Sequence, residues 1–277
     1  MASDASLFEA LLARRDHASA AIDWCEANYA VTPHVAEFYN TLSSLSFCAA
    51  GASMLLAARA LRARLPAALL LAGPLVTLLG LFSAAFHATL ALPWQRADEV
   101  AENLSLVALL HGARAAPAPR LLALHAVAAT LGILFVHAFL FTEAHLVATA
   151  GALARALGAR AAAAARKDSA ANWVRGLSDA LATRLGVAGA AAVGGAAAWL
   201  VDRAACSRLV GLPFNPQLHA VWHLAGALAL HEAFSAAALA AAGGRGVALR
   251  TFAGGALSRV EPAAARGSGG GGGAVRH

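Results

Sequence analysis

The chain has 277 residues, of which 60% are hydrophobic and only 13% are charged, with a mean hydropathy of +0.64. Soluble domains usually carry about 25% charged and about 45–50% apolar residues, so this composition excludes an ordinary soluble enzyme. A membrane-spanning helix needs roughly 20 apolar residues, which leaves room for one helical bundle and no sizeable soluble domain. The net charge of +6 comes from 20 Arg and one Lys scattered between apolar runs, so we expect no nucleic-acid partner.

The first 37 residues are polar and charged, and Asp4, Glu9 and Arg14 interrupt any apolar run. A cleavable signal peptide needs an uninterrupted apolar core, so we expect this segment to be retained. Seven apolar stretches follow, which we interpret as membrane-spanning helices. They lie at residues 38–58, 66–90, 98–113, 119–136, 138–157, 185–202 and 216–242.

Two segments interrupt or follow these stretches. Residues 158–184 carry several charges and are expected to form an exposed loop, with or without an amphipathic helix. The glycine run from Gly267 cannot bury a core and is expected to be disordered. The predicted architecture is therefore an all-α, seven-transmembrane helix bundle in residues 38–242, between an N-terminal segment (1–37) and a disordered glycine-rich tail (243–277).

The basic residues predict the orientation of this bundle. With seven spans, the connections after the first, third and fifth spans share one side of the membrane with the C-terminal tail. These segments hold 16 of the 21 basic residues, among them Arg160 and Arg184. Because Lys and Arg concentrate on the cytosolic side, we expect a cytosolic C-terminus and a lumenal N-terminus.

Several polar residues fall where a membrane should not tolerate them, at about 2.5–3.5 kcal/mol for each Asp, Lys or Arg on insertion scales. Ser83 and His87 are four residues apart at the end of the second span, and His219 and His223 are four apart at the start of the seventh, so each pair shares a helix face. Asp98 begins the third span. The predicted topology brings all five to the lumenal ends of three helices.

Three neutral imidazoles with an open fourth position are the ligand set of a catalytic zinc ion. We therefore expect His87, His219 and His223 to hold Zn²⁺. Asp98 is placed to take the proton of the catalytic water, and Ser83 to hydrogen-bond that water or a developing oxyanion. Chance pairing of histidines at this spacing remains the alternative.

The other intramembrane polar residues show no comparable grouping in the sequence. We expect them to be satisfied within the bundle, by packing, hydration or hydrogen bonds. This group comprises His111, His125, His137, His145, His231 and Glu232.

The segment DWCEANYAVTPHVAEFYNT places Asp23, Glu26, Asn28 and Glu37 immediately before the first span. Closely spaced oxygen ligands are what Ca²⁺ selects, although the glycine and the Asp repeats of an EF-hand loop are absent. The residues alone leave open a solvated acidic loop.

Cys25 and Cys206 both fall on the predicted lumenal side, where a disulfide between them would tie the acidic loop to the bundle. The alternative is that both thiols are free. Cys48 lies within the first span and is expected to be a small buried residue.

Four blocks of sequence together resemble the alkaline ceramidase family, membrane amidases of a superfamily that also contains the adiponectin receptors. The blocks are DWCEANY with AEFYNT, SAAFHATL followed by QRADE, WLVDRAACSRL, and NPQLHAVWH, in order from Asp23 to His223. After QRADE the family usually continues with apolar residues, whereas this chain has Glu102 and Asn103, a difference that concerns the pocket wall rather than a ligand.

The resemblance implies zinc on His87, His219 and His223, with Ser83 and Asp98 beside the catalytic water. It also implies an enzyme of the endoplasmic reticulum or Golgi membrane that hydrolyses ceramide to sphingosine and a fatty acid and requires calcium. No obligate protein partner is evident. Two alternatives are a lipid hydrolase of the glycosylphosphatidylinositol-remodelling type and a non-enzymatic receptor of the adiponectin-receptor type.

For the calcium ion, the resemblance implies binding by Asp23, the backbone carbonyl of Trp24, Glu26, Asn28 and Glu37. The Trp24 carbonyl comes from the resemblance alone, because side-chain chemistry does not single it out.

Overall fold

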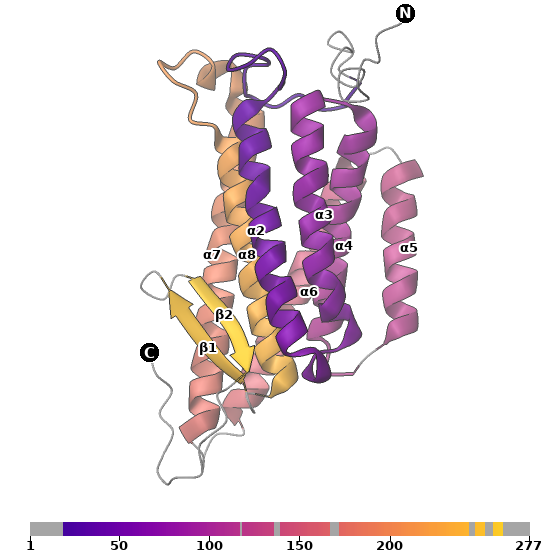
Figure 1. Ribbon diagram of the computed structural model, residues 1–277, viewed down its shortest axis with the longest axis vertical. Helices are drawn as coiled ribbons and strands as arrows, with labels where there is room; N and C mark the ends of the chain where they lie inside the picture. The colour runs from indigo at the N-terminus through magenta and orange to yellow at the C-terminus, as the bar shows by residue number, and fades with distance from the viewer. Residues whose placement is uncertain are drawn as a thin grey trace, which may run out of the picture.

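The computed structural model describes residues 19–116, 118–135, 139–166, 172–243, 247–252 and 257–262. This part of the chain forms an upright bundle of seven α-helices with one antiparallel β-hairpin beside its lower end (Figure 1). A short 3₁₀ turn, η1 (Arg62–Arg64), joins the first two helices. The elements are α2 (Phe38–Ala60), α3 (Ala67–Thr89), α4 (Leu92–Ala113), α5 (Pro119–Phe135), α6 (Phe139–Arg166), α7 (Asn172–Leu209), α8 (Leu218–Ala242), β1 (Val247–Phe252) and β2 (Leu257–Pro262).

Each of the seven apolar stretches lies on one helix, so the prediction of a helical membrane protein is confirmed at this level. Four helical segments are long and apolar enough to cross a membrane, namely α2, α3, residues Leu177–Leu209 of α7, and α8. Helix α5 is also apolar but shorter. The count of seven spans and the orientation of the termini remain predictions.

The prediction of an exposed loop at residues 158–184 is wrong for most of this segment, because α6 continues to Arg166 and α7 begins at Asn172. This segment is rich in alanine, the strongest helix former, and its charges do not interrupt the helices. Arg184 is fully buried and forms an ion pair with Glu232 on α8 at 3.0 Å, while Arg160 donates to the carbonyl of Ala240. Neither arginine is therefore a loop residue that reports orientation.

The tail expected to be disordered contains the β-hairpin. Strands β1 and β2 pair in register from Val247 with Pro262 to Phe252 with Leu257, and the side chain of Val260 is buried in the main core of the bundle. Residues 247–249 of β1 are partly buried and Arg250 is exposed, as expected for a strand pair with one covered face. The glycine run from Gly267 lies outside the described residues.

Helices α2 and α3 approach each other through glycines. A β-carbon on Gly51 would lie 2.6 Å from the backbone nitrogen of Thr77, and one on Gly80 would lie 2.7 Å from that of Cys48. Side chains at these positions would collide with backbone, so the two helices are held at a separation that only glycine permits. This contact fixes α3, which carries the first catalytic candidates, against α2.

Candidate active site

Three histidines converge near one end of the bundle, as the sequence predicts. His87 comes from the last turn of α3, and His219 and His223 come from one face of the first two turns of α8. One ligand nitrogen of each lies within 4.8 Å of the others, and all three side chains are buried. Among the described residues, these three histidines form the one group of at least three His, Cys, Asp or Glu side chains that lie close enough together to hold a metal ion.

Neighbouring side chains orient the three rings. Nδ1 of His87 contacts a carboxylate oxygen of Glu37, Nδ1 of His223 lies 2.8 Å from Oγ of Ser43, and the ring of His219 stacks on the indole of Trp24 with centroids 3.8 Å apart. A partner on the second ring nitrogen fixes the tautomer and direction of a metal-binding imidazole.

Two nitrogens of this cluster, Nε2 of His87 and Nδ1 of His219, are buried without a hydrogen-bond partner. Burial of an unpaired polar atom is unfavourable, and a metal ion would satisfy both. The donor set therefore fits zinc, which takes neutral imidazole nitrogens.

Ser83 and Asp98 lie beside the histidines. Ser83 is one turn before His87 on α3, with Oγ 3.1 Å from that of Ser44, and it hydrogen-bonds Asp98 on α4. The other carboxylate oxygen of Asp98, Oδ1, is buried and unpartnered. Helix α4 begins at Leu92, six residues earlier than predicted, with a proline in its first turn, so Asp98 lies in the second turn rather than at the start.

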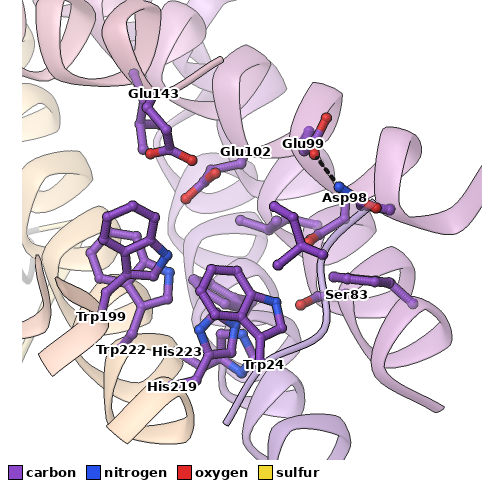
Figure 2. Close-up of a pocket in the computed structure, with 16 residues that line it drawn as sticks. Trp24, Ser83, Asp98, Glu99, Glu102, Glu143, Trp199, His219, Trp222 and His223 are labelled. Carbon is purple, nitrogen blue, oxygen red and sulfur yellow. Dashed lines mark hydrogen bonds between the residues drawn. The ribbon is translucent and has the colours of Figure 1, made fainter. Parts of the chain in front are cut away.

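A cavity opens onto Ser83, Asp98, His219 and His223. Figure 2 shows that its wall also carries indole rings and carboxyl groups, among which the sequence connected only Glu102 with the pocket wall and only the backbone of Trp24 with a metal site. These are Trp24, Trp199, Trp222, Glu99, Glu102 and Glu143. The cavity thus joins the candidate catalytic residues to a mixed aromatic and acidic wall.

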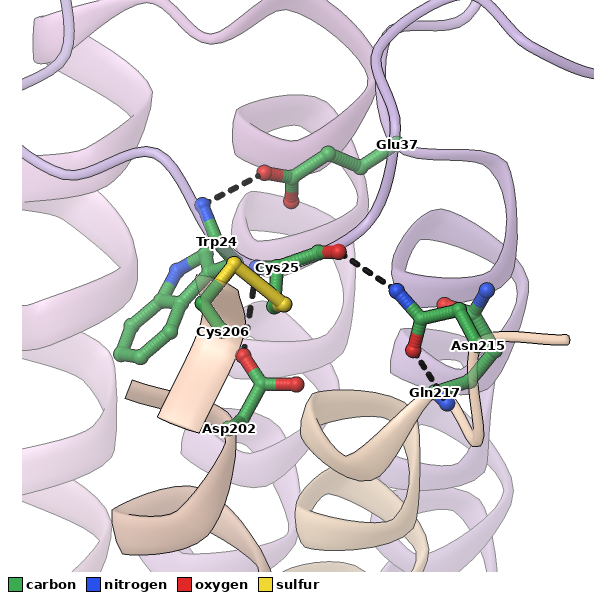
Figure 3. Close-up of a disulfide and its surroundings, with 7 residues drawn as sticks. All are labelled: Trp24, Cys25, Glu37, Asp202, Cys206, Asn215 and Gln217. Carbon is green, nitrogen blue, oxygen red and sulfur yellow. Dashed lines mark hydrogen bonds between the residues drawn. A yellow bond between two sulfur atoms is a disulfide. The ribbon is translucent and has the colours of Figure 1, made fainter. Parts of the chain in front are cut away.

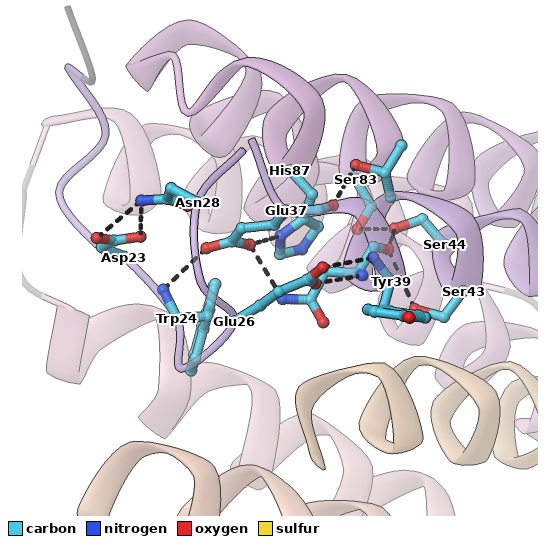
Figure 4. Close-up of polar contacts among 12 residues, drawn as sticks. Asp23, Trp24, Glu26, Asn28, Glu37, Tyr39, Ser43, Ser44, Ser83 and His87 are labelled. Atoms are coloured by element: carbon cyan, nitrogen blue, oxygen red, sulfur yellow. Dashed lines mark hydrogen bonds and ion pairs between the residues drawn. The ribbon is translucent and has the colours of Figure 1, made fainter. Parts of the chain in front are cut away.

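The acidic N-terminal segment folds over this end of the bundle (Figure 4). The amide of Asn28 donates to the carboxylate of Asp23 at 3.1 Å, Asp23 also contacts Glu37, and Glu37 accepts from the backbone N–H of Trp24 at 3.0 Å. Glu26 differs, because its two carboxylate oxygens accept the N–H groups of the first turn of α2, at 2.7 and 2.9 Å. Four of the five expected calcium-binding residues therefore lie together, and Glu26 already holds the start of α2.

Burial dominates the electrostatics of these carboxyl groups. It raises the pKa of Glu37 to about 7, although hydrogen bonds from Asn40 and Trp24 act in the opposite direction. Burial also raises the pKa values of Asp23 and Glu26 above their usual range. A bound cation would reverse this effect by favouring the ionised carboxylates.

A disulfide joins Cys25 to Cys206, with Cα atoms 5.3 Å apart (Figure 3). Cys206 lies on α7, which continues to Leu209, beyond the stretch expected to end at residue 202. One turn earlier on α7, the buried Asp202 accepts from the backbone N–H of Cys25 at 3.2 Å and from that of His219. Asn215 completes the attachment, since its amide donates to the carbonyl of Cys25 at 2.6 Å.

Sequence reasoning missed Asp202 and Asn215 as parts of the site. Asp202 was detectable as an ionisable residue within an apolar stretch, a feature that calls for a functional or structural partner. Its partners are backbone groups far along the chain, and nothing in the residue pattern identifies them.

A second set of histidines forms a chain between α4, α5 and α6. His111 Nε2 lies 3.3 Å from His125 Nδ1, His125 Nε2 lies 3.0 Å from His145 Nε2, and His145 Nδ1 lies 2.7 Å from Oδ1 of Asn103. One set of neutral tautomers supplies a donor and an acceptor at every link. These histidines are thus bonded to one another and to Asn103, although Nδ1 of His111 is buried without a partner. His137 lies outside the described residues.

A family model described as Ceramidase matches residues 16–248, most of the chain and all of the site. The chain belongs to the ceramidase family. This ceramidase-family chain is 37% identical over 83 residues to alkaline ceramidase 1 of Homo sapiens, 30% of this chain and 31% of that protein. It is 34% identical over 83 residues to alkaline ceramidase of Drosophila melanogaster, 30% of this chain and 29% of that protein.

A shorter match reaches 67% identity over 27 residues with putative alkaline ceramidase dcd3A of Dictyostelium discoideum, 10% of this chain and 9% of that protein. The matched segments cover less than a third of the length of each of these relatives.

Proposed function

We propose that this ceramidase-family chain is a zinc-dependent membrane enzyme that hydrolyses the amide bond of ceramides to a sphingoid base and a fatty acid. One observation carries the proposal. Three buried histidines from two helices lie together, two of them with an unpartnered nitrogen, beside a cavity lined by His219, His223, Asp98 and Ser83. The relatives named as alkaline ceramidases support ceramide as the substrate.

His87, His219 and His223 would hold the zinc ion. When bound, zinc supplies a Lewis acid for the amide carbonyl and lowers the pKa of a water toward about 7. Glu37, Ser43 and the indole of Trp24 would keep the three rings in position, as described above.

Asp98 and Ser83 supply the groups that move and hold protons in this proposal. Oδ1 of Asp98 has no partner, so it is free to accept a proton from the attacking water and return it to the leaving nitrogen. The hydroxyl of Ser83 lies one helical turn from His87, where it would donate to the oxyanion that forms on the former carbonyl.

The N-terminal segment would bind Ca²⁺ through Asp23, the Trp24 carbonyl, Asn28 and Glu37, with Glu26 nearby at the start of α2. In this role calcium is structural. It would neutralise the carboxylates of Asp23 and Glu37, and Glu37 in turn contacts both Trp24 and His87. It would not contact the substrate.

The remaining parts of the proposal concern the membrane. Ceramide would enter laterally from the bilayer, with its chains between helices and its amide at the lumenal end of a seven-span bundle in the endoplasmic reticulum or Golgi. A glycosylation tag at the N-terminus tests this orientation. A cytosolic N-terminus would instead favour the adiponectin-receptor type of protein.

The decisive experiment uses purified protein, a ceramide panel and a zinc chelator. His219→Ala should abolish ceramide hydrolysis while the protein stays folded in the membrane. His231→Ala is the matched control, because His231 lies on the same helix, two turns beyond His223, and contacts Ser53 instead of the cluster. Full activity of His219→Ala would refute the zinc assignment, and hydrolysis of phospholipid esters but not ceramide would refute the substrate.

A further inference from the structure

Two carboxyl groups in the cavity wall have no role in the proposed mechanism. Glu102 comes from α4 and Glu143 from α6, and both line the cavity that contains Asp98 and His219. In Figure 2 the two side chains point toward each other across the upper part of the cavity. The two carboxyl groups are close enough for Glu143 to act electrostatically on Glu102.

Their surroundings differ from those of the neighbouring acid Glu99. Glu99 is neutralised by Arg96 at 2.6 Å and accepts a hydrogen bond from Gln95 at 2.7 Å. Across the described residues, no hydrogen bond reaches the carboxyl group of Glu102 or Glu143, although Glu143 is attracted by Arg203 at longer range. The pair therefore has unused hydrogen-bond acceptors that face a cavity.

Aromatic rings complete this part of the wall. The indoles of Trp199 on α7 and Trp222 on α8 lie below Glu143 in Figure 2. Carboxylates combined with indole faces attract a cation, because the negative face of the ring adds to the charge of the acid. Both indoles and both carboxyl groups line the same cavity, so a cation held there would meet charge and ring faces together.

The rest of the wall restricts which cation fits. Leu79, Leu146 and Phe47 line the same cavity, and these apolar surfaces favour a ligand whose charge is attached to a hydrocarbon chain. An ammonium group carries three N–H donors, enough to serve both carboxyl groups at once.

We propose that Glu102 and Glu143, together with Trp199 and Trp222, bind the ammonium group of a long-chain primary amine. Amines of this class are one product of amide hydrolysis, so the inference deepens the proposed function and rests on it for the physiological ligand. The pair would hold the amine after cleavage, at a distance from the histidine cluster, and would make the free amine a competitor of the substrate.

Binding can be measured without catalysis. Octadecylamine would be titrated into the full-length protein in nanodiscs, with tryptophan fluorescence and thermal stability as readouts, and octadecanol and octadecanoic acid as uncharged and anionic probes of equal chain length. We expect the amine alone to bind tightly. Glu102→Gln and Glu143→Gln preserve shape and should each weaken amine binding by about tenfold or more, as expected for loss of a charge-assisted hydrogen bond.

Glu261→Gln, on strand β2 outside the cavity, removes the same charge and should leave amine binding unchanged. Equal binding of amine and alcohol, or unchanged amine binding in both cavity variants, would overturn the inference. Because no turnover is needed, the two proposals fail separately. If the protein hydrolyses ceramide but amine binding does not depend on Glu102 and Glu143, only the ammonium site is refuted. If amine binding depends on the two residues but ceramide is not hydrolysed, only the proposed reaction is refuted.

Discussion

The side chain of Glu37 contacts Nδ1 of His87, so the acidic N-terminal segment reaches directly into the histidine cluster. The same carboxyl group accepts hydrogen bonds from the backbone of Trp24 and the amide of Asn40, both at 3.0 Å. One carboxyl group therefore belongs to the proposed calcium site and also orients a proposed zinc ligand. Calcium binding and zinc binding should be coupled through it.

Glu37→Gln should lower zinc affinity by about 10- to 100-fold, the usual effect of removing a partner that orients a metal-binding histidine. Competition with a chromogenic chelator measures this affinity directly. Unchanged zinc affinity in Glu37→Gln would show that the contact has no orienting role.

Calcium affinity should rise with pH between about pH 6 and pH 8. Burial raises the pKa of Glu37 from 4.5 to about 7, and the carboxyl group must lose its proton to bind the cation. Below this pKa, one proton is displaced for each ion bound, so affinity should change by up to about tenfold per pH unit and level off above it. Calcium-dependent thermal shifts would measure the effect.

Without calcium, the stability of the folded protein should fall, not rise, as the pH increases. A carboxyl group with a raised pKa in the folded state binds protons more tightly there than in the unfolded chain. The calcium-free protein should therefore lose stability as pH rises from about 4.5 to 7. Glu37→Gln should weaken both trends, and a calcium affinity independent of pH in the native chain would contradict the assignment of Glu37 as a ligand.

Reduction of the Cys25–Cys206 disulfide should destabilise the protein by about 2–5 kcal/mol, because it closes a loop with a sequence separation of 181. It should also weaken zinc binding, since Trp24 and its stack on His219 lie next to Cys25. Thermal unfolding with and without reductant tests the first effect. Cys206→Ser should show the loss and no further response to reductant, and a native-like melting temperature for this variant would contradict the expectation.

The buried ion pair of Arg184 and Glu232 predicts a non-additive result. Glu232→Leu leaves the guanidinium buried beside an apolar side chain and should cost roughly 3–5 kcal/mol. Arg184→Met combined with Glu232→Leu removes both charges and should recover most of this loss. Thermal denaturation of the two single variants and the double variant measures the coupling, and additive losses would show that the pair does not act as a unit.

The sequence identifies the residues of the histidine cluster because their positions obey local rules. His219 and His223 share a helix face through their spacing, and His87 reaches the same level because consecutive antiparallel helices alternate direction. These rules need no knowledge of side-chain contacts.

The features that sequence reasoning missed depend on contacts between distant residues. Glu37 and His87 are 50 residues apart, and Arg184 and Glu232 are 48 apart. Arg184 resembles a loop residue until its partner is known, because an isolated charge is costly in a span and a paired one is tolerated. Helix propensity then extends α6 and α7 through the alanine-rich segment where charge alone predicted a loop.

The glycine contacts between α2 and α3 have a consequence for the route of a lipid. Backbone atoms of the two helices come too close at Gly51 and Gly80 for even a methyl group to fit between them. A hydrocarbon chain therefore cannot pass through this seam without separating the helices. The cavity is also bordered by α4, α6, α7 and α8, so a membrane substrate must reach it by a route other than the seam between α2 and α3.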